Sequence, residues 1–375
     1  MALNPNNFDW LQKLRQINVF VLILIGIMGA ISAIMLYSAA GGDVSPWAQK
    51  QLLRFAMGVT IMLLVALTPL HFWLRQAYVL YGVSVVLLVI VEIAGTIGMG
   101  AQRWIDLYVF RLQPSELVKL TLVLSLARYY HYASLESARK FIFHLPPLLI
   151  TIIPAVLVLK QPDLGTALLL FMITGVMIFV SGIRLWKVGL ILTSAIACMP
   201  LAWMFLRDYQ KNRVLTFLNP ERDPLGSGYH ILQSKIAFGS GGVWGKGLLQ
   251  GSQSQLKFLP EKHTDFIFAM LSEELGMVGG IILIGFYSLL IFYGYMVSLH
   301  CRNIFGKLLA FGLTTILFLY MFINMAMVMG LLPIVGMPLP LISYGGTSML
   351  TLLTGFGLIL CVDRHRHLRR GLSAP

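Results

Sequence analysis

Charged residues are scarce in this sequence: Asp, Glu, Lys and Arg together make up 11% of its 375 residues, whereas hydrophobic residues make up 58%. A water-soluble domain with so few charges could not cover its surface with polar groups. Cysteine is also scarce, and Cys198, Cys301 and Cys361 have no paired spacing. They predict neither a disulfide framework nor a metal site. We therefore expect lipid, rather than water, to be the main solvent of the chain.

The sequence contains long apolar runs. A membrane-spanning helix needs about 20 predominantly apolar residues. Runs of this kind lie near 17–40, 55–69, 78–98, 115–128, 143–159, 164–181, 185–206, 266–297, 306–330 and 344–362. We predict an all-α polytopic membrane protein in which residues 1–375 form a single transmembrane domain of about ten helices. A large extracytoplasmic loop, residues 207–264, is expected between the seventh and eighth helices. The first run is too long for a secretory signal and is expected to remain as an anchor.

Lys and Arg are distributed unequally between the two sides of this topology. The segments on the side of the N-terminus hold fourteen of them, and the short segments on the opposite side hold five. Short loops rich in Lys and Arg stay in the cytoplasm. We therefore expect a multi-pass protein of the cytoplasmic (inner) membrane with both termini inside and the 207–264 loop outside. The net charge of +13 then indicates anionic lipid, and not nucleic acid, as a partner.

Four polar clusters interrupt the apolar background, and all four face outward in this topology. In the first, residues 100–119, Pro114 suits the first turn of a helix, and Glu116 and Lys119 lie three residues apart on one helix face. An acid and a base inside the membrane are costly and are usually functional. They either fix helix packing as an ion pair alone or form a pair beside a substrate cavity.

The second and third clusters also leave alternatives open. In 161–166, Asp163 either caps the next helix or takes part in an active site. Within the outer loop, glycines at 239–247 fit neither a dinucleotide fingerprint nor a P-loop. They either form flexible turns or let backbone N–H groups approach a phosphate, assisted by Lys246.

The third cluster ends at the start of the eighth predicted helix. Thr264 or Asp265 can cap that helix, and both the helix N-terminus and Lys262 would favour the charged form of the Asp265 carboxylate. Because a charged carboxylate can accept a proton, Asp265 is a candidate base as well as a candidate cap. In the fourth cluster, 330–348, three prolines and repeated glycines interrupt the helix at membrane depth. Irregular backbone is tolerated there only inside protein or along a polar cavity, so this segment is expected to line a site.

Together the clusters resemble the SEDS proteins (shape, elongation, division and sporulation), and the resemblance spans nearly the whole chain. Its specific motifs are 113–119 (QPSELVK), 161–167 (QPDLGTA), 223–230 (DPLGSGYH), 233–242 (QSKIAFGSGG), 259–268 (LPEKHTDFIF) and 343–346 (SYGG). The run 251–256 and the short termini look like the rod-shape branch of the family rather than the division branch.

The resemblance implies a peptidoglycan glycosyltransferase that polymerises lipid II into β-1,4-linked strands during cell elongation and releases undecaprenyl pyrophosphate. The essential acid of the family falls on Asp265 and its ion pair on Glu116 and Lys119. Further substrate-binding residues are expected at Arg103, Arg111, Asp163, Arg213, Lys246, His263 and Ser343. The expected partners are lipid II and the growing glycan strand, a class B penicillin-binding protein that supplies the transpeptidase step, and the elongation machinery.

The departing diphosphate needs cations, and Lys119, Arg103, Arg111 and Arg213 are the candidates. A divalent cation, Mg²⁺ or Mn²⁺, is expected only from this leaving group and the family, because no metal-ligand motif is present; no organic cofactor is expected. A lipid II flippase and a non-catalytic scaffold for a synthase are the competing functions. Polar clusters at one face and the lack of an evident internal repeat favour the enzyme over a transporter. The role of Glu92, inside the third predicted span, is left open.

Overall fold

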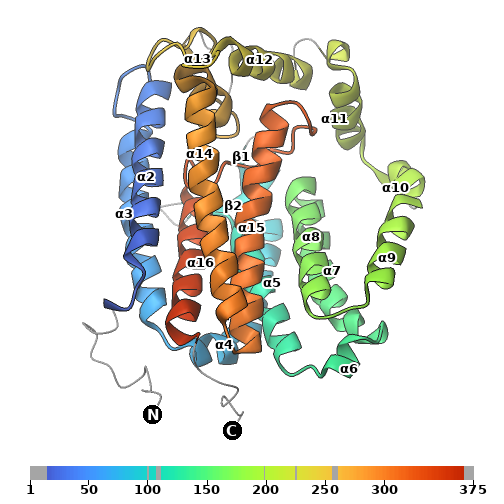
Figure 1. Cartoon of the computed structure of the whole chain (residues 1–375). Coiled ribbons are helices and arrows are strands. Elements are labelled where there is room, and N and C mark those ends of the chain that lie inside the picture. Colours follow the sequence, from blue (N-terminus) through green and yellow to red (C-terminus); the bar gives the residue numbers. More distant parts are fainter. Residues whose placement is uncertain are drawn as a thin grey trace.

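The predicted spans form a bundle of long helices (Figure 1). The structure is a computed structural model that describes residues 15–98, 101–106, 111–197, 199–223, 226–255 and 261–366. The ten apolar runs become α2 (Val19–Ala39), α3 (Ala48–Leu67), α4 (Leu70–Ala94), α5 (Pro114–His131), α7 (Leu145–Lys160), α8 (Leu164–Val180), α9 (Leu185–Ala197) with α10 (Met199–Phe205), α14 (Ile267–His300), α15 (Ile304–Val328) and α16 (Gly346–His365). The predicted polytopic α-helical membrane fold is confirmed.

Seven helical stretches in the described part of the chain are long and apolar enough to cross a membrane by themselves. The other three predicted spans are too short or too polar to meet this criterion. The α8 helix has 17 residues, α5 carries the Glu116 and Lys119 charges, and the seventh run is divided between α9 and α10. The α5 and α8 helices pack against α15 and against each other. Helix faces that are packed against protein do not need to be apolar, because they do not face lipid.

The segments that join the spans contain structure that the sequence analysis did not predict. A three-stranded antiparallel sheet of β1 (Thr96–Gly98), β2 (Ala101–Asp106) and β3 (Arg111–Leu112) follows α4. The outer loop holds α11 (Asp208–Leu218), η3 (Pro220–Arg222), α12 (Ser227–Ser240) and α13 (Ser252–Gln255), and the α5–α7 connection holds α6 (Leu135–Ala138) and η2 (Ile142–His144). Figure 1 shows α11, α12 and α13 at the end of the bundle where α14 begins, whereas α2 begins and α16 ends at the opposite end. We refer to the first as the α11–α13 end.

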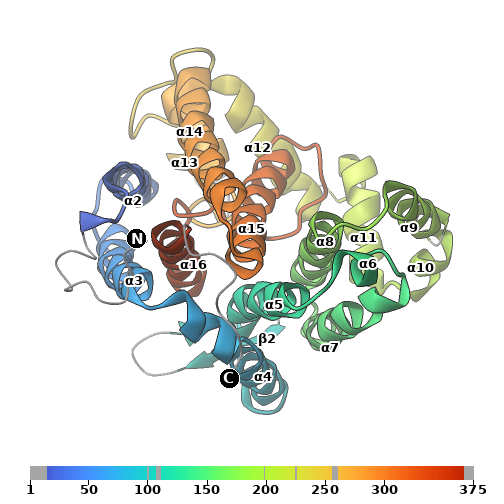
Figure 2. The ribbon, with the colours of Figure 1, turned by 60° about the horizontal axis from the view of Figure 1, so that its bottom comes forward.

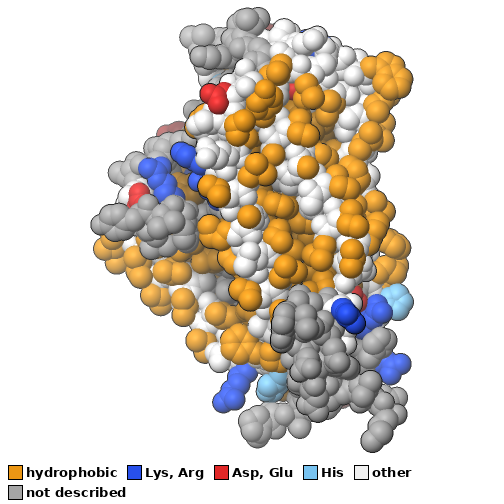
Figure 3. Space-filling model, turned by 90° about the vertical axis from the view of Figure 1, so that its left-hand side faces the viewer, with side chains coloured by type: hydrophobic (Ala, Val, Ile, Leu, Met, Phe, Trp, Pro, Cys, Tyr) orange, Lys and Arg blue, Asp and Glu red, His pale blue; other side chains and the backbone are white. Residues whose placement is uncertain are grey.

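The buried centre of the bundle is formed by α15 and α16, most of whose residues are buried. In the tilted view of Figure 2, α16 lies among α3, α5 and α15, and α4, α7 and α10 lie at the margin. The face drawn in Figure 3 carries hydrophobic side chains over its middle and shows its charged side chains toward the ends and edges. This distribution fits a molecule whose sides face lipid.

Between α15 and α16, the chain leaves helical geometry yet stays buried. Leu339, Leu341 and Ile342 are at most 2% exposed, so the carbonyls of this segment need donors from the protein. Polar side chains of four helices supply them. Asn324 donates to Met337 O (2.7 Å), Tyr287 to Pro340 O, Ser32 to Ile342 O (2.8 Å) and Gln51 to Ser343 O (3.0 Å). The prediction that irregular backbone is buried in protein here is confirmed.

We expect Asn324→Leu to destabilise the protein by about 1–3 kcal/mol for each carbonyl it leaves unpaired, because Asn324 donates to two of them and Leu has a similar volume. Thermal unfolding in detergent measures the change. The control is Thr60→Val, which removes only a hydroxyl bonded to the carbonyl of Ala56 in its own helix. Equal melting temperatures for the two variants would contradict the prediction.

Candidate active site

The turn that precedes α14 is fixed through three consecutive carbonyls. The carbonyls of residues 263, 264 and 265 accept hydrogen bonds from Tyr344 N (2.8 Å), Ser343 Oγ (2.6 Å) and Asn324 Nδ2 (2.9 Å), respectively. The donors come from the irregular segment and from α15. The backbone that carries Asp265 is therefore part of the same buried network as the irregular segment.

The Asp265 side chain does not cap α14. The N-cap residue of α14 is Phe266, which makes no side-chain capping hydrogen bond. The Thr264 hydroxyl donates instead to Glu261 O (3.2 Å) and Oε2 (3.0 Å). The expected cap at Thr264 or Asp265 is thus absent. Instead, the Asp265 carboxylate lies against Gly336, where an added Cβ would be 3.5 Å from its Oδ2. Gly336 has a φ of +77°, so the backbone conformation favours glycine here.

The pKa of the Asp265 carboxyl is raised to about 6, and burial is the largest cause. Neighbouring Glu261 and Asp163 also raise the pKa, whereas Arg213 lowers it. The expectation that Lys262 and the helix N-terminus would favour the charged form is therefore wrong, because loss of water outweighs them. A carboxyl with a pKa near 6 is still mostly ionised at neutral pH and is a stronger base than an ordinary Asp.

The segment 334–336 brings three of the predicted clusters together. The Arg213 guanidinium donates to Ile334 O (3.4 Å), and a Cβ on Gly165 would collide with the Val335 side chain. The next residue, Gly336, contacts the Asp265 carboxylate. The start of α8, the outer loop and the turn at 263–265 thus converge here. The sequence analysis predicted only that the fourth cluster lines a site.

Asp163 caps α8 and also belongs to this convergence. Its carboxylate accepts hydrogen bonds from Thr166 N (3.1 Å) and Thr166 Oγ1 (2.9 Å), and its charge contributes to the raised pKa of Asp265. Arg103 donates to Gln161 O (2.9 Å) and Pro162 O (2.6 Å). It therefore fastens β2 to the connection that precedes Asp163. The capping alternative is confirmed, and it does not exclude a role in the site.

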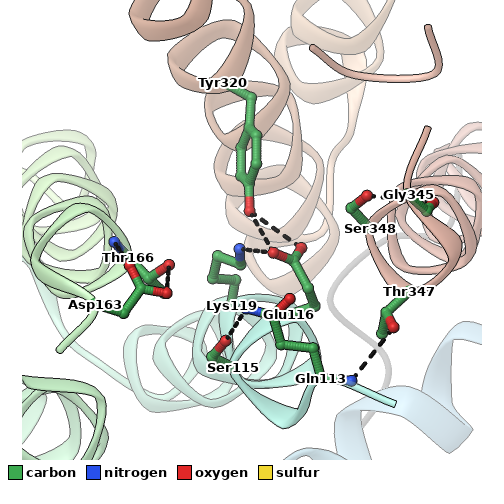
Figure 4. A network of polar contacts seen from close by, with 10 residues as sticks. All are labelled: Gln113, Ser115, Glu116, Lys119, Asp163, Thr166, Tyr320, Gly345, Thr347 and Ser348. Carbon is green, nitrogen blue, oxygen red and sulfur yellow. Dashed lines mark hydrogen bonds and ion pairs between the residues drawn. The ribbon is translucent and has the colours of Figure 1, made fainter. Parts of the chain in front are cut away.

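Glu116 and Lys119 form the predicted ion pair (Figure 4). Lys119 Nζ lies 2.7 Å from Glu116 Oε1, and their side chains are 2% and 8% exposed. The Tyr320 hydroxyl donates to both Glu116 oxygens at 3.0 and 3.1 Å, and Lys119 Nζ lies 4.5 Å from the Tyr320 ring centre. A lysine enclosed in this way has its charge already compensated. Its contacts support a role in positioning α5 against α15 more directly than contact with a diphosphate.

Lys246 is engaged away from Asp265. Its Nζ lies 2.8 Å from Glu273 Oε1 and 2.8 Å from Ser252 Oγ. The backbone N–H groups of residues 246 and 247 donate to the carbonyls of Glu273 and Glu274. The glycine-rich stretch thus packs on α14 and is not a set of free turns, and these two N–H groups are not available to a phosphate.

Two glycines allow this contact between backbones. A Cβ on Gly245 would collide with the backbone of Glu274, and a Cβ on Gly276 would collide with the backbone of Gly245. Gly276 has φ 67° and ψ −166°, which interrupts α14 after residue 275. The first part of α14, directly after Asp265, is therefore set at an angle that the glycine-rich stretch fixes.

Three further residues that the sequence analysis named, Arg111, Ser343 and Glu92, have different surroundings. Arg111 pairs loosely with Asp106 at 3.8 Å, with both side chains well exposed, and its carbonyl accepts a hydrogen bond from Thr347 Oγ1 (2.8 Å). Ser343 is 3% exposed and its hydroxyl serves the Thr264 carbonyl. Glu92 is exposed on the last turn of α4, where a carboxylate can reach the membrane surface.

Sequence reasoning missed a row of stacked side chains beside the turn at 263–265. His263 stacks on Trp47 with ring centres 4.5 Å apart and planes inclined by 8°. It also contacts Tyr344 at 5.9 Å, and Arg54 lies 4.8 Å from the Tyr344 ring centre. Burial lowers the pKa of His263. The available signal was that Trp47 and Arg54 are seven residues apart, and so occupy the same face of one helix.

The described residues contain no group of three or more His, Cys, Asp or Glu side chains that could hold a metal ion. Structural zinc sites and carboxylate-rich calcium sites use such groups.

A bundle of membrane-spanning helices with a partly buried acid at one end, its backbone fixed by a buried irregular segment, defines a membrane-embedded enzyme rather than a soluble one. The family model of the cell cycle proteins FtsW, RodA and SpoVE matches residues 12–368. The chain belongs to this family, to which the SEDS motifs pointed.

Characterised relatives cover the same length. The chain is 43% identical over 367 residues to the peptidoglycan glycosyltransferase MrdB of Escherichia coli K12, with 98% of both chains covered. It is 32% identical to the peptidoglycan glycosyltransferase RodA of Treponema pallidum, with 94% of this chain and 99% of the relative covered.

Solved structures of relatives share the fold. A chain from a structure described as "Structural coordination of polymerization and crosslinking by a peptidoglycan synthase complex" matches with a TM-score of 0.81 and 32% identity, covering 94% of this chain and 98% of that one. The rod shape determining protein RodA of Thermus thermophilus matches with a TM-score of 0.70 and 27% identity, covering 94% of this chain and 98% of that one.

We expect Lys119→Met to destabilise the protein by about 3–5 kcal/mol, because it leaves the buried Glu116 carboxylate without its cation. The double variant Glu116→Gln/Lys119→Met removes both charges and should recover most of this loss. Thermal unfolding measures both. A double variant that is less stable than Lys119→Met would contradict the prediction.

The same double variant decides between the two roles of the pair. If it is stable and retains transferase activity, the pair serves packing alone. If it is stable and inactive, the charges of the pair contribute to the reaction.

Proposed function

We propose that this chain polymerises lipid II into β-1,4-linked glycan strands at the outer face of the cytoplasmic membrane, with Asp265 as the base. The chain is a peptidoglycan glycosyltransferase, as its family and its closely similar relatives establish. The proposed mechanism rests on the position and the raised pKa of the Asp265 carboxyl. Its backbone is fixed by Asn324 and its neighbours, and burial brings its pKa to about 6.

The proposed chemistry is a single displacement. Asp265 takes the proton from the 4-hydroxyl of the acceptor sugar while that oxygen attacks the anomeric carbon of the donor. The bond between the anomeric carbon and the diphosphate oxygen breaks, and its electron pair leaves with undecaprenyl pyrophosphate. Attack opposite the leaving group inverts an α-linked donor and gives a β-linked product. The proton then passes from Asp265 to water.

Cations must offset the charge of the departing diphosphate. We assign Arg213 first, because it is partly buried, donates to Ile334 O beside the convergence, and influences the pKa of Asp265. Arg103 and Arg111 approach from the β-sheet, where Arg103 already bonds the 161–162 carbonyls. A Mg²⁺ or Mn²⁺ ion, if required, would arrive with the diphosphate.

The orientation and the partners are also part of the proposal. The charge distribution of the loops supports cytoplasmic termini, which puts the α11–α13 end and Asp265 on the outside, where lipid II is polymerised. The structurally similar chain comes from a peptidoglycan synthase complex that couples polymerisation to crosslinking. This likeness supports a class B penicillin-binding protein as the transpeptidase partner, within the elongation machinery.

Reconstitution of the purified chain with lipid II, alone and with a class B penicillin-binding protein, tests the proposal. We expect glycan polymer from the wild type and a loss of at least about 100-fold from Asp265→Asn, which keeps the shape but removes the base. The control is Asp208→Asn, an exposed acid in the same outer segment, which should polymerise normally.

The same assay separates the alternatives. Undiminished polymer from Asp265→Asn would show that the base lies elsewhere. Movement of lipid II across vesicles without polymer would indicate a flippase, and polymer that appears only from the partner's own activity would indicate a scaffold.

The pH dependence of kcat/KM provides a second test. Because Asp265 acts as the carboxylate, activity should fall as the pH drops through about 6, the raised pKa of this group. Glu261→Gln should move this acid limb to lower pH, and Arg213→Gln should move it to higher pH, since Glu261 raises and Arg213 lowers the pKa. His263→Gln should retain the limb. Shifts of both charge variants in the same direction would refute the assignment.

A further inference from the structure

A polar cavity of about 810 Å³ lies where α2 begins and α14 and α16 end. Its volume falls within the range of ligand pockets, about 300–1,000 Å³. The lining residues are Gln16, Asn18, Tyr293, Met296, Val297, His300, Arg302, Asp363 and Arg366. Figure 1 shows that these helix ends lie at the opposite end of the bundle from α11, α12 and α13.

The single acid of this cavity is already engaged. Tyr293 donates to Asp363 Oδ2 at 2.9 Å, and Arg366 NH1 lies 3.1 Å from Asp363 Oδ1. By contrast, Arg302 and His300 are exposed and form no ion pair within the described part of the chain. The cavity therefore has an excess of positive charge, and Arg302 is its uncompensated cation.

The position of the cavity favours a lipid over a soluble anion. It lies where the apolar helix α14 ends, so that its polar rim meets the boundary between lipid tails and water. Met296 and Val297 line it on the side of α14 that leads into the membrane, and the neighbouring Leu299 is 61% exposed. Basic pockets between membrane helices at this depth suit the phosphate of an anionic headgroup.

We propose that this cavity binds the phosphodiester headgroup of an anionic phospholipid, with Arg302 as its principal cation and the acyl chains lying along α14. The ligand chemistry is a phosphate oxyanion, for which free phosphate is the competing source. The proposal does not depend on the glycosyltransferase mechanism, since the cavity shares no residue with the Asp265 site.

Native mass spectrometry of the purified full-length chain, delipidated and titrated with phosphatidylglycerol or phosphatidylcholine, tests the proposal. We expect tighter retention of phosphatidylglycerol by the wild type. Arg302→Gln should weaken this retention about five-fold, the factor that corresponds to about 1 kcal/mol for one interfacial cation. The matched control is Arg184→Gln, which removes an exposed cation from the α8–α9 connection outside the cavity and should retain phosphatidylglycerol as the wild type does.

Further measurements distinguish a lipid headgroup from free phosphate and show whether the variants still fold. His300→Gln should also weaken retention, and unchanged melting temperatures should accompany both cavity variants because both side chains are exposed. Inorganic phosphate at millimolar concentration should leave the lipid bound; displacement by phosphate would overturn the lipid assignment. Equal losses in Arg302→Gln and Arg184→Gln would overturn the site itself, since they would show only a general effect of net charge.

Discussion

The need to satisfy buried carbonyls governs both the fold and the site of this protein. A chain that leaves helical geometry inside a bundle exposes backbone groups to a medium without water, and each unpaired group is costly. Here Asn324 donates to carbonyls of both the irregular segment and the turn at 263–265, and the Ser343 hydroxyl donates to Thr264 O and accepts from Leu339 N. The two side chains thus join the irregular segment to the backbone of Asp265, so the two segments depend on one network.

The bundle holds two carboxylates, Glu116 and Asp265, in different surroundings. The Glu116 carboxylate has a lysine and a tyrosine hydroxyl as direct partners, which compensates its burial. The Asp265 carboxylate faces Gly336 and interacts with Arg213 only through space. An acid left partly uncompensated has a raised pKa and can exchange protons near neutral pH. The two carboxylates therefore differ in their neighbours: Glu116 has direct hydrogen-bond partners, whereas burial raises the pKa of Asp265.

The spans and the Glu116–Lys119 pair could be predicted from sequence because both depend on local properties, namely the length of apolar runs and the spacing of residues on a helix. The predicted topology placed all four polar clusters on one side of the membrane, but it did not predict that three of them meet at 334–336. Three features could not be predicted, because each depends on segments that are brought together only in the fold. They are the Lys246–Glu273 pair, the Trp47–His263 stack and the burial that raises the pKa of Asp265. The sheet after α4 was also missed, since its strands are too short to show a clear alternating pattern.

The contact between Gly245 and Gly276 has a mechanical consequence. Backbone lies directly on backbone, with no side chain between them to deform, so the glycine-rich stretch and the adjacent turn of α14 must move as one piece. Hydrogen bonds lie on both sides of this contact: residues 246 and 247 donate to the carbonyls of Glu273 and Glu274, and Met277 and Val278 donate to the carbonyls of Gly242 and Val243. A displacement of the outer segment would therefore be passed to α14 on both sides of its interruption at Gly276.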